Sequence, residues 1–266
     1  MTTTRVLVLL AAALASAVLV TGCASSPGGA APGEAPSLSD QTDAQRRARI
    51  RLQLAIGYYE QRQMGVALDE IRQALAADPA FAEAYVMRAL IYMDMGENKL
   101  ADENFLQAIK LSPNNPDFNN NYGWFLCQNG REKDSIAYFD AALKNRSYQS
   151  PAKALNNAGI CSMKLKNKSA AERYFSQAFQ YDPGNPTTNT NLARIYYDQG
   201  GYERARFYIG RVMKSDVMTA DVLWLAIKIE RKLGDRAAES SLVTQLRRRH
   251  GGSAEFAAYQ RGAFDE

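Results

Sequence analysis

The stretch AEAYVMRALIYMDMGENKLADENFLQAIKLSPNN, residues 82–115, decides the fold of this chain, because its pattern returns every 34 residues. Small residues stand at positions 8 and 20 of the stretch, and a proline stands at position 32. The 34 residues before it make the same choices, so that Ala55, Ala67 and Pro79 match Ala89, Ala101 and Pro113. A period of this length is typical of a chain built from stacked copies of one small unit.

Six copies of the pattern can be followed along the chain, and the last is degenerate. They begin at Ala48, Ala82, Pro116, Ala152, Pro186 and near Ala220. The period, the small residues and the final proline together are the signature of the tetratricopeptide repeat, a helix–turn–helix unit. We predict an all-α fold, a tetratricopeptide-repeat superhelix of about six repeats, near residues 48–81, 82–115, 116–151, 152–185, 186–219 and 220–253.

The spacing has a direct physical meaning for two packed helices. Small residues at positions 8 and 20 let the helices approach closely, and residues at positions 24 and 27 share one helix face that packs on the next repeat. A glycine near position 15 provides the turn, and the proline at position 32 ends the second helix. We expect a right-handed superhelix with a concave side lined by the first helices, which suits it to bind a protein partner.

The start of the chain differs from the rest and predicts an export signal followed by a tether. Residues 6–20 form an uninterrupted run of apolar and small residues, too short for a comfortable membrane span. We interpret residues 1–22 as a lipoprotein signal peptide and residues 23–43, rich in Pro, Gly, Ala and Ser, as a flexible tether. The repeat domain then covers residues 44–266, whose last stretch, Gly251 to Glu266, could be an extra helix or a tail.

The end of the apolar run, Val20-Thr21-Gly22-Cys23, resembles the cleavage box of bacterial lipoproteins. The resemblance implies that Cys23 becomes the acylated first residue of the mature chain, held in a bilayer because each buried methylene contributes about 0.8 kcal/mol. No Asp follows Cys23, which in such lipoproteins implies sorting to the outer membrane, facing the periplasm. The alternative is an ordinary secretory signal with a coincidental cysteine.

Composition argues against both catalysis and nucleic-acid binding. The formal net charge is only +4 over 266 residues, which gives little support to a nucleic-acid partner. The single histidine, His250, lies in a basic stretch; no Cys/His cluster has zinc spacing, and no Gly-rich loop follows a strand. We therefore expect no catalytic residues, no metal, no cofactor and no enzyme activity, and we expect a monomer.

Besides Cys23 the chain has two cysteines, Cys127 and Cys161. Both fall in predicted first helices, at position 12 of the third repeat and position 10 of the fourth. In an oxidising periplasm they could form a disulfide, provided that their α-carbons come within about 7 Å. Equally, they could be two small buried apolar residues.

Two sets of first-helix residues are candidates for binding a partner in the groove. Asparagines at positions 5 and 6 would stack into a polar ladder that can hold a peptide backbone, namely Asn120, Asn121, Asn156, Asn157 and Asn191, although asparagine is common there in such repeats. An apolar set in repeats one and two could dock a helix or a strand, namely Leu52, Ile56, Tyr59, Val86, Leu90 and Met93. Alternatively, the segment Leu38–Ile50 folds back and covers the apolar set.

The run NNNYGWFLCQNG, residues 119–130, goes beyond the general repeat pattern. It resembles the type IV pilus biogenesis lipoproteins, the tetratricopeptide pilotins, over roughly residues 46–249. Further matching segments are YFDAAL at 138–143, NAGIC at 157–161, AERYF at 171–175 and ARFYI at 205–209. Both cysteines fall where that family often places them.

The resemblance implies a binding function without a reaction. Such proteins travel to the outer membrane on their lipid, bring a subunit of the pilus secretin with them, and promote its assembly into a multimeric ring. We expect the secretin to bind the groove of the first two or three repeats, while acylated Cys23 attaches the chain to the lipid bilayer. The alternative is a general periplasmic adaptor lipoprotein that docks an envelope protease or a cell-wall enzyme.

Overall fold

The computed structural model describes residues 42–214 and 218–264, so Cys23 and the predicted signal peptide lie outside the described residues. Asp43 to Glu266 form one compact unit. The regular secondary structure of the described residues consists of thirteen α-helices. This confirms the all-α fold class that the 34-residue period predicts.

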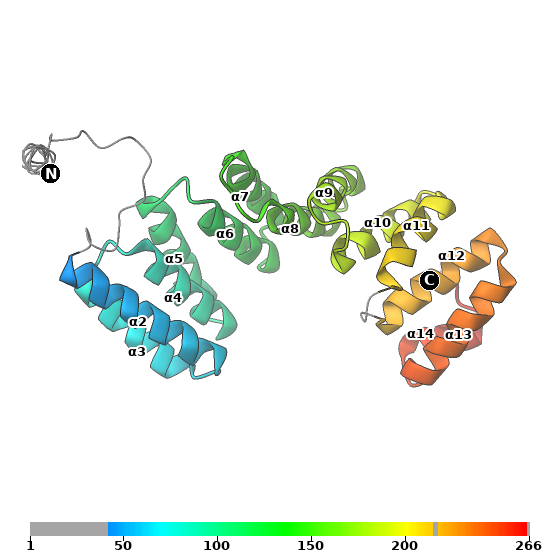
Figure 1. Cartoon of the computed structure of the whole chain (residues 1–266), viewed down its shortest axis with the longest axis horizontal. Helices are drawn as coiled ribbons and strands as arrows, with labels where there is room; N and C mark the ends of the chain where they lie inside the picture. Colours follow the sequence, from blue (N-terminus) through cyan, green and yellow to red (C-terminus); the bar gives the residue numbers. More distant parts are fainter. Residues whose placement is uncertain (1–41, 215–217, 265–266) are drawn as a thin grey trace, which may run out of the picture. The chain divides into compact units, whose positions relative to one another are not determined.

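The helices come in pairs, one for each predicted repeat, and Figure 1 shows the pairs in chain order. The first helices are α2 (Asp43–Glu60), α4 (Ala82–Asp94), α6 (Pro116–Gln128), α8 (Pro151–Lys164), α10 (Pro186–Asp198) and α12 (Ala220–Leu233). The second helices are α3 (Met64–Ala77), α5 (Asn98–Leu111), α7 (Glu132–Lys144), α9 (Lys168–Tyr181), α11 (Tyr202–Val212) and α13 (Arg236–His250). The last helix, α14 (Ala254–Arg261), follows the sixth pair.

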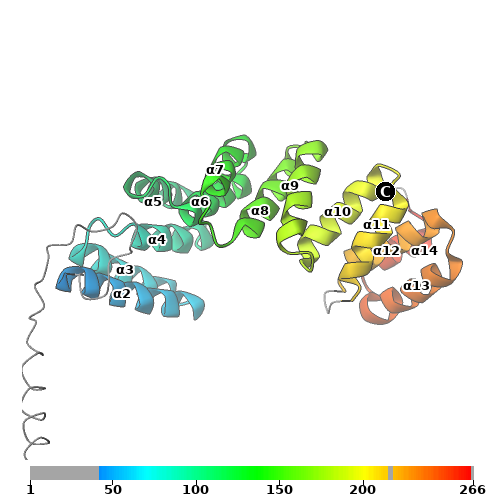
Figure 2. The same ribbon diagram turned by 45° about the horizontal axis from the view of Figure 1, so that its top comes forward.

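Helices that follow one another in the chain pack against one another. The two helices of a repeat form the most extensive interfaces, and each second helix then packs on the first helix of the next repeat (Figure 2). First helices of adjacent repeats also touch, as α2 does with α4, α6 with α8 and α10 with α12. This is the predicted tetratricopeptide-repeat superhelix, in which the first helices line one surface.

The core lies between the paired helices, at the positions that the repeat pattern marks. Position 24 of repeats two to four is a phenylalanine with no exposed surface, namely Phe105, Phe139 and Phe175. In repeats three and four the residue facing that ring from position 8 is a glycine, Gly123 or Gly159, and the ring fills the space that a β-carbon would take. Burial of each such ring contributes about 1.5–3 kcal/mol to folding.

The turn between the two helices of a repeat uses the left-handed backbone conformation at position 15. Four repeats place a glycine there, with φ between 76° and 80°: Gly96, Gly130, Gly200 and Gly234. Repeats one and four place Arg62 and Lys166 at the same position, with φ of 61° and 59°. Because a side chain crowds the backbone in this region, these two turns are strained relative to the glycine turns.

The sixth repeat departs from the pattern and still folds as a helix pair. Its position 20, which is small in the other repeats, is Glu239, and this side chain is only 7% exposed. The Glu239 carboxylate accepts a hydrogen bond of 2.9 Å from the guanidinium of Arg231, which lies in the last turn of α12. A buried carboxylate is tolerated when it is paired in this way.

The C-terminal stretch forms an extra helix, which decides between the two alternatives left open by the sequence. The Ser253 hydroxyl accepts a hydrogen bond from the Phe256 amide and so caps the N-terminus of α14. Phe256, Tyr259 and Phe264 pack against a buried cluster of α12 and α13 residues. The last described residues therefore cover the end of the sixth repeat.

Candidate protein-binding surface

The six apolar residues predicted for the groove divide into buried and half-exposed ones. Leu52 and Val86, both at position 5, are only 7% and 8% exposed and belong to the core clusters. The structure thus corrects their assignment, because in these two repeats position 5 of the first helix faces the core rather than the open surface. The other four, at positions 9 and 12, keep part of their surface exposed: Ile56, Tyr59, Leu90 and Met93.

The segment Leu38–Ile50, an alternative candidate to cover these residues, does not fold back over them where the structure describes it. Residues 43–50 continue α2, and Ile50 is 56% exposed. A chain within one continuous helix cannot fold back over that helix. Residues 38–41 lie outside the described residues.

Side chains at positions 9 and 12 of the first helices that keep at least part of their surface exposed define what we call the first-helix surface. In repeats one to four these positions are mostly apolar, namely Ile56, Tyr59, Leu90, Met93, Trp124, Ile160 and Met163. In repeats five and six the same positions become largely cationic, with Arg194 and Lys228 at position 9 and Arg231 at position 12. The first-helix surface therefore changes from apolar to basic along the chain.

Tyr59 also joins the first two repeats. Its hydroxyl donates a hydrogen bond of 2.8 Å to the Asp94 carboxylate, which also pairs with Arg62 at 3.1 Å. Burial, together with the Asp94 carboxylate, raises the pKa of Tyr59 to about 12. The Tyr59 hydroxyl is thus engaged within the protein. The other partly exposed apolar side chains at positions 9 and 12 of repeats one and two are Ile56, Leu90 and Met93.

The asparagines of the predicted ladder bond mainly to the protein itself. Asn120 is fully buried, and its side-chain oxygen accepts a hydrogen bond of 3.0 Å from the Asn157 amide of the next repeat. Asn156 accepts a hydrogen bond of 2.6 Å from the Thr188 hydroxyl. The Asn191 amide donates to its own helix, at the Thr187 carbonyl.

This bonding corrects the picture of an open polar ladder. Asn120 and Asn156 join repeats three, four and five, and a buried amide that has lost its partner would destabilise the fold. Asn121, Asn157 and Asn191 keep part of their surface exposed. A pocket of about 480 Å³ opens beside Asn157 between repeats four and five, bounded among others by Lys153, Ile160 and Asp182.

Cys127 and Cys161 are joined by a disulfide, with their α-carbons 5.8 Å apart. Both side chains are fully buried, and they lie in α6 and α8, the first helices of repeats three and four. The bond closes a loop across one whole repeat, since the two cysteines are 34 residues apart. It therefore links the first helices of repeats three and four covalently.

Two buried tyrosines that sequence reasoning did not single out also join neighbouring repeats. The Tyr122 hydroxyl donates to the Asp102 carboxylate at 2.9 Å, and the Tyr174 hydroxyl donates to the Asp140 carboxylate at 2.9 Å. Burial is the main cause that raises the pKa of both tyrosines, and the accepting carboxylates add to it. The neutral hydroxyl is therefore the form that the fold holds.

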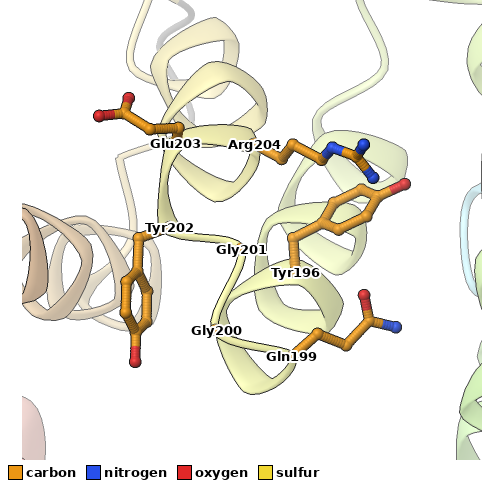
Figure 3. A pocket seen from close by; sticks show the side chains of 7 residues that line it. All are labelled: Tyr196, Gln199, Gly200, Gly201, Tyr202, Glu203 and Arg204. Carbon is orange, nitrogen blue, oxygen red and sulfur yellow. The ribbon is translucent and has the colours of Figure 1, made fainter.

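A second pocket, of about 450 Å³, lies at the turn between α10 and α11 (Figure 3). Its residues include Tyr196, Gly201 and Arg204, and the Arg204 guanidinium lies 5.5 Å from the centre of the Tyr196 ring. Gly201 stands at position 16, where Asn167 and Asp235 of other repeats cap the second helix with their side chains. The second helix of repeat five therefore begins without a side-chain cap.

The described residues were also searched for metal-binding clusters and membrane-spanning helices. Within residues 42–214 and 218–264, no three His, Cys, Asp or Glu side chains gather so as to hold a metal ion. The His250 ring hydrogen-bonds the Met218 carbonyl through Nε2 at 2.8 Å. In the same part of the chain, no helix is both long enough and apolar enough to cross a bilayer.

Comparison with known proteins identifies the family. Models of the tetratricopeptide repeat match residues 52–101, 86–150, 133–186 and 163–225. The solved structure of PilW, described as a widely conserved type IV pilus biogenesis factor, is 34% identical, with a TM-score of 0.72 over 80% of this chain and 98% of PilW. This chain belongs to the tetratricopeptide-repeat family of type IV pilus biogenesis factors.

A second member of this family is PilF, a type IV pilus assembly protein of Pseudomonas aeruginosa. PilF is 27% identical over 244 residues, which are 92% of this chain and 94% of PilF. Its solved structure gives a TM-score of 0.79 at 26% identity, covering 83% of this chain and all of that one. The likeness to both family members thus spans the whole repeat array rather than single repeats.

Proposed function

We propose that this tetratricopeptide-repeat protein acts in type IV pilus biogenesis as a pilotin. In this proposal it is anchored at the periplasmic face of the outer membrane by acylated Cys23, binds a subunit of the pilus secretin, and promotes its assembly into multimers. The observation that carries the proposal is the similarity to PilW and PilF, across 98% of the solved PilW chain and 94% of PilF. The segment Val20-Thr21-Gly22-Cys23, which resembles a lipoprotein cleavage box, supports the anchor.

The mechanism proposed is binding without a reaction. The secretin segment packs on the apolar part of the first-helix surface in repeats one and two, around Ile56, Leu90 and Met93. An apolar side chain buried there contributes about 25 cal/mol for each Å² removed from water. The lipid on Cys23 then carries the bound subunit to the outer membrane.

The double variant Ile56→Glu, Leu90→Glu tests the proposed surface in cells. Both residues are half-exposed, so the charges reach water in the free protein and oppose burial by a partner. We expect secretin multimers in the outer membrane to be lost, as measured by membrane fractionation and non-denaturing electrophoresis. Leu52 and Val86 are left unchanged because charges at these buried positions would unfold the repeats.

The matched control is Val66→Glu, Leu106→Glu. These residues are 41% and 44% exposed and lie in α3 and α5, the second helices of the same two repeats. The control carries the same added charge on the other helices, and we expect it to assemble normal multimers. Normal multimers in the Ile56 and Leu90 variant, with the protein folded and present at wild-type level, would refute the proposed surface.

The variant Cys23→Ala tests the lipid anchor separately. We expect the protein to leave the outer membrane and the secretin to remain unassembled or in the inner membrane. If the protein leaves the outer membrane while secretin multimers form there normally, the protein is not the secretin's carrier. A general adaptor role would then be the better account.

A further inference from the structure

The first helix of the array, α2, lacks the neighbour that covers every later first helix. Each of α4, α6, α8, α10 and α12 packs against the second helix of the preceding repeat. Within residues 42–214 and 218–264, no second helix precedes α2 (Figure 1). The side of α2 that corresponds to those contacts is therefore open.

The positions that make these contacts are buried in the later repeats and exposed in repeat one. At positions 3 and 10 of repeats two to six, all side chains are at most 5% exposed, namely Ala84, Phe118, Ala154, Thr188, Val222, Ile91, Phe125, Cys161, Ile195 and Ile229. Repeat one has Ile50 at position 3, 56% exposed, and Leu54 at position 7, 42% exposed. The end of a repeat array that faces water carries polar residues, so this apolar pair indicates a surface that is covered in use.

Arginines surround the apolar pair. Four of them stand within six residues, namely Arg46, Arg47, Arg49 and Arg51. Arg46 pairs with Asp43 at 3.6 Å. Arg51 pairs with Glu70 at 2.9 Å. Arg47 and Arg49 are exposed and form an ion pair with none of the residues that the structure describes, so they add two positive charges beside Ile50.

The spacing along α2 places cation and apolar residues on one face. Arg47 precedes Ile50 by three residues, and Leu54 follows Ile50 by four, so the three side chains are neighbours on the helix surface. Gly57, three residues further on, adds no side chain to this face. We call Arg47, Arg49, Ile50 and Leu54 the outer face of α2.

We propose that the outer face of α2 lies on the surface of the bilayer that holds the lipid anchor, against anionic phospholipid headgroups. Ile50 and Leu54 enter the boundary between headgroups and acyl chains, while Arg47 and Arg49 contact lipid phosphates. Apolar residues flanked by arginines are typical of a helix that lies in this boundary. The inference rests on the anchor of the proposed function and adds that the array begins at the membrane, with α2 against it.

The place of α2 in the chain favours a bilayer over a protein partner. Asp43 follows Cys23 by 20 residues. A coil of that length has a mean end-to-end distance of about 25 Å, so acylated Cys23 keeps α2 close to the membrane surface. A weak contact is then sufficient, because a short tether gives an effective concentration of about millimolar. A stable protein interface needs about 800 Å² from each partner, far more than two apolar side chains provide.

Co-sedimentation with lipid vesicles tests the outer face in the absence of the acyl group. The protein is the purified chain of residues 23–266 with Cys23→Ala. We expect binding to vesicles of phosphatidylglycerol and phosphatidylethanolamine to be at least about tenfold stronger than binding to phosphatidylcholine vesicles at low salt. Binding to the anionic vesicles should weaken as the ionic strength rises.

This measurement is independent of the anchor itself. Because the purified chain carries no acyl group, its result does not depend on whether Cys23 is acylated in cells. A failure of the anchor would appear in the cellular location of Cys23→Ala, whereas a failure of the outer face would appear in the vesicle assay. The two outcomes are therefore distinguishable.

Two double variants separate the apolar and the charged contributions. Ile50→Asn, Leu54→Asn should lose about tenfold in affinity for the anionic vesicles, and so should Arg47→Gln, Arg49→Gln. All four side chains are exposed, so we expect both variants to fold, as circular dichroism checks. Arg47→Lys, Arg49→Lys keeps the charge and should keep the affinity.

Each variant has a matched control elsewhere on the array. Val66→Asn, Leu106→Asn removes two exposed apolar side chains from α3 and α5. Arg248→Gln, Arg249→Gln removes two exposed arginines from α13. Both controls should bind the anionic vesicles like the wild type.

Several results would overturn the proposal. Absence of binding, equal binding to anionic and neutral vesicles, or equal losses in the α2 variants and their controls would show that the outer face does not recognise a bilayer. Sedimentation velocity supplies a further test. Self-association that Ile50→Asn, Leu54→Asn abolishes, without vesicle binding, would assign the outer face to a second copy of the chain.

Discussion

Gly159 of α8 faces Phe175 of α9 so closely that a β-carbon built on the glycine would lie 2.6 Å from Cε1 of the ring. The same relationship holds between Gly123 and Phe139 in the preceding repeat, at 2.9 Å. Both phenylalanines are fully buried. In these two repeats the glycine is thus required because a side chain would not fit beside the ring. Its backbone is helical, a conformation that any residue can adopt.

The substitution Gly159→Ala should therefore destabilise the protein, although alanine is the better helix former. The added methyl group must displace a ring that is buried on all sides, and we expect the free energy of unfolding to fall by about 1–3 kcal/mol. Chemical denaturation followed by circular dichroism measures this change. Gly57→Ala is the control: nothing lies within 4 Å of a β-carbon there, so stability should rise by about 0.5–1 kcal/mol. Equal effects of the two substitutions would contradict the packing argument.

Lys166→Gly should stabilise the protein, against the usual effect of adding a glycine. Lys166 sits at position 15 with φ of 59°, where a side chain costs about 1–2 kcal/mol. Glycine removes this strain, but its greater conformational freedom in the unfolded chain offsets part of the stability gained. We expect a net gain of about 0.5–1 kcal/mol in the free energy of unfolding. Gly130→Ala, at the same position of repeat three, should have the opposite sign. A loss of stability in Lys166→Gly would show that the turn is not strained.

Reduction of the Cys127–Cys161 disulfide should loosen the middle of the array. A closed loop of 34 residues restricts the unfolded chain enough to contribute about 3–4 kcal/mol. We expect a lower melting temperature in the presence of a reductant, and the same shift in the variant Cys127→Ala, Cys161→Ala without one. A thiol titration of the denatured Cys23→Ala chain, prepared from an oxidising compartment, should find no free thiol. Two free thiols would exclude the bond.

Tyr148 and Tyr122 should respond in opposite ways to the loss of the hydroxyl. The Tyr148 hydroxyl is buried and has no hydrogen-bond partner among the described residues, so Tyr148→Phe should raise the free energy of unfolding by about 1 kcal/mol. Tyr122 donates to Asp102, so Tyr122→Phe should lower it by about 1 kcal/mol. Thermal or chemical denaturation at pH 7 compares the two variants. A loss of stability in Tyr148→Phe would show that its hydroxyl has a partner.

Because the Tyr148 hydroxyl is buried, we expect the free energy of unfolding to fall in alkali. Burial raises its pKa in the folded state to about 12, above the ordinary value of 10.0, with Asp117 as a lesser cause. Between these two values the unfolded chain has lost the proton that the folded chain keeps. Stability should therefore fall as the pH rises from about 10 to about 12, and by less in Tyr148→Phe.

The pattern of small residues was sufficient to predict the paired helices of each repeat. Ala67, Ala101 and Ala171 at position 20 are fully buried, because the close approach of two helices depends on residue size alone. The binding residues were harder to predict. Leu52 and Ile56 are both apolar and one helical turn apart, yet one is buried and the other half-exposed, since the direction of each side chain depends on where the second helix packs.

The sequence by itself determined the repeat period, the helix pairs and the turns, because these depend on interactions between residues less than one repeat apart. Only the tertiary structure decided what happens between repeats. It turned Asn120 and Asn156 inward to join neighbouring repeats, and it placed Arg231 of α12 over the Phe264 ring and Lys228 over the Tyr197 ring. Such contacts depend on how each helix pair is stacked on the next and on where the last helix returns. The physical reason is that the residues of one repeat determine how its own two helices pack. Which side chains remain exposed to a partner depends on the neighbouring repeats that cover the rest.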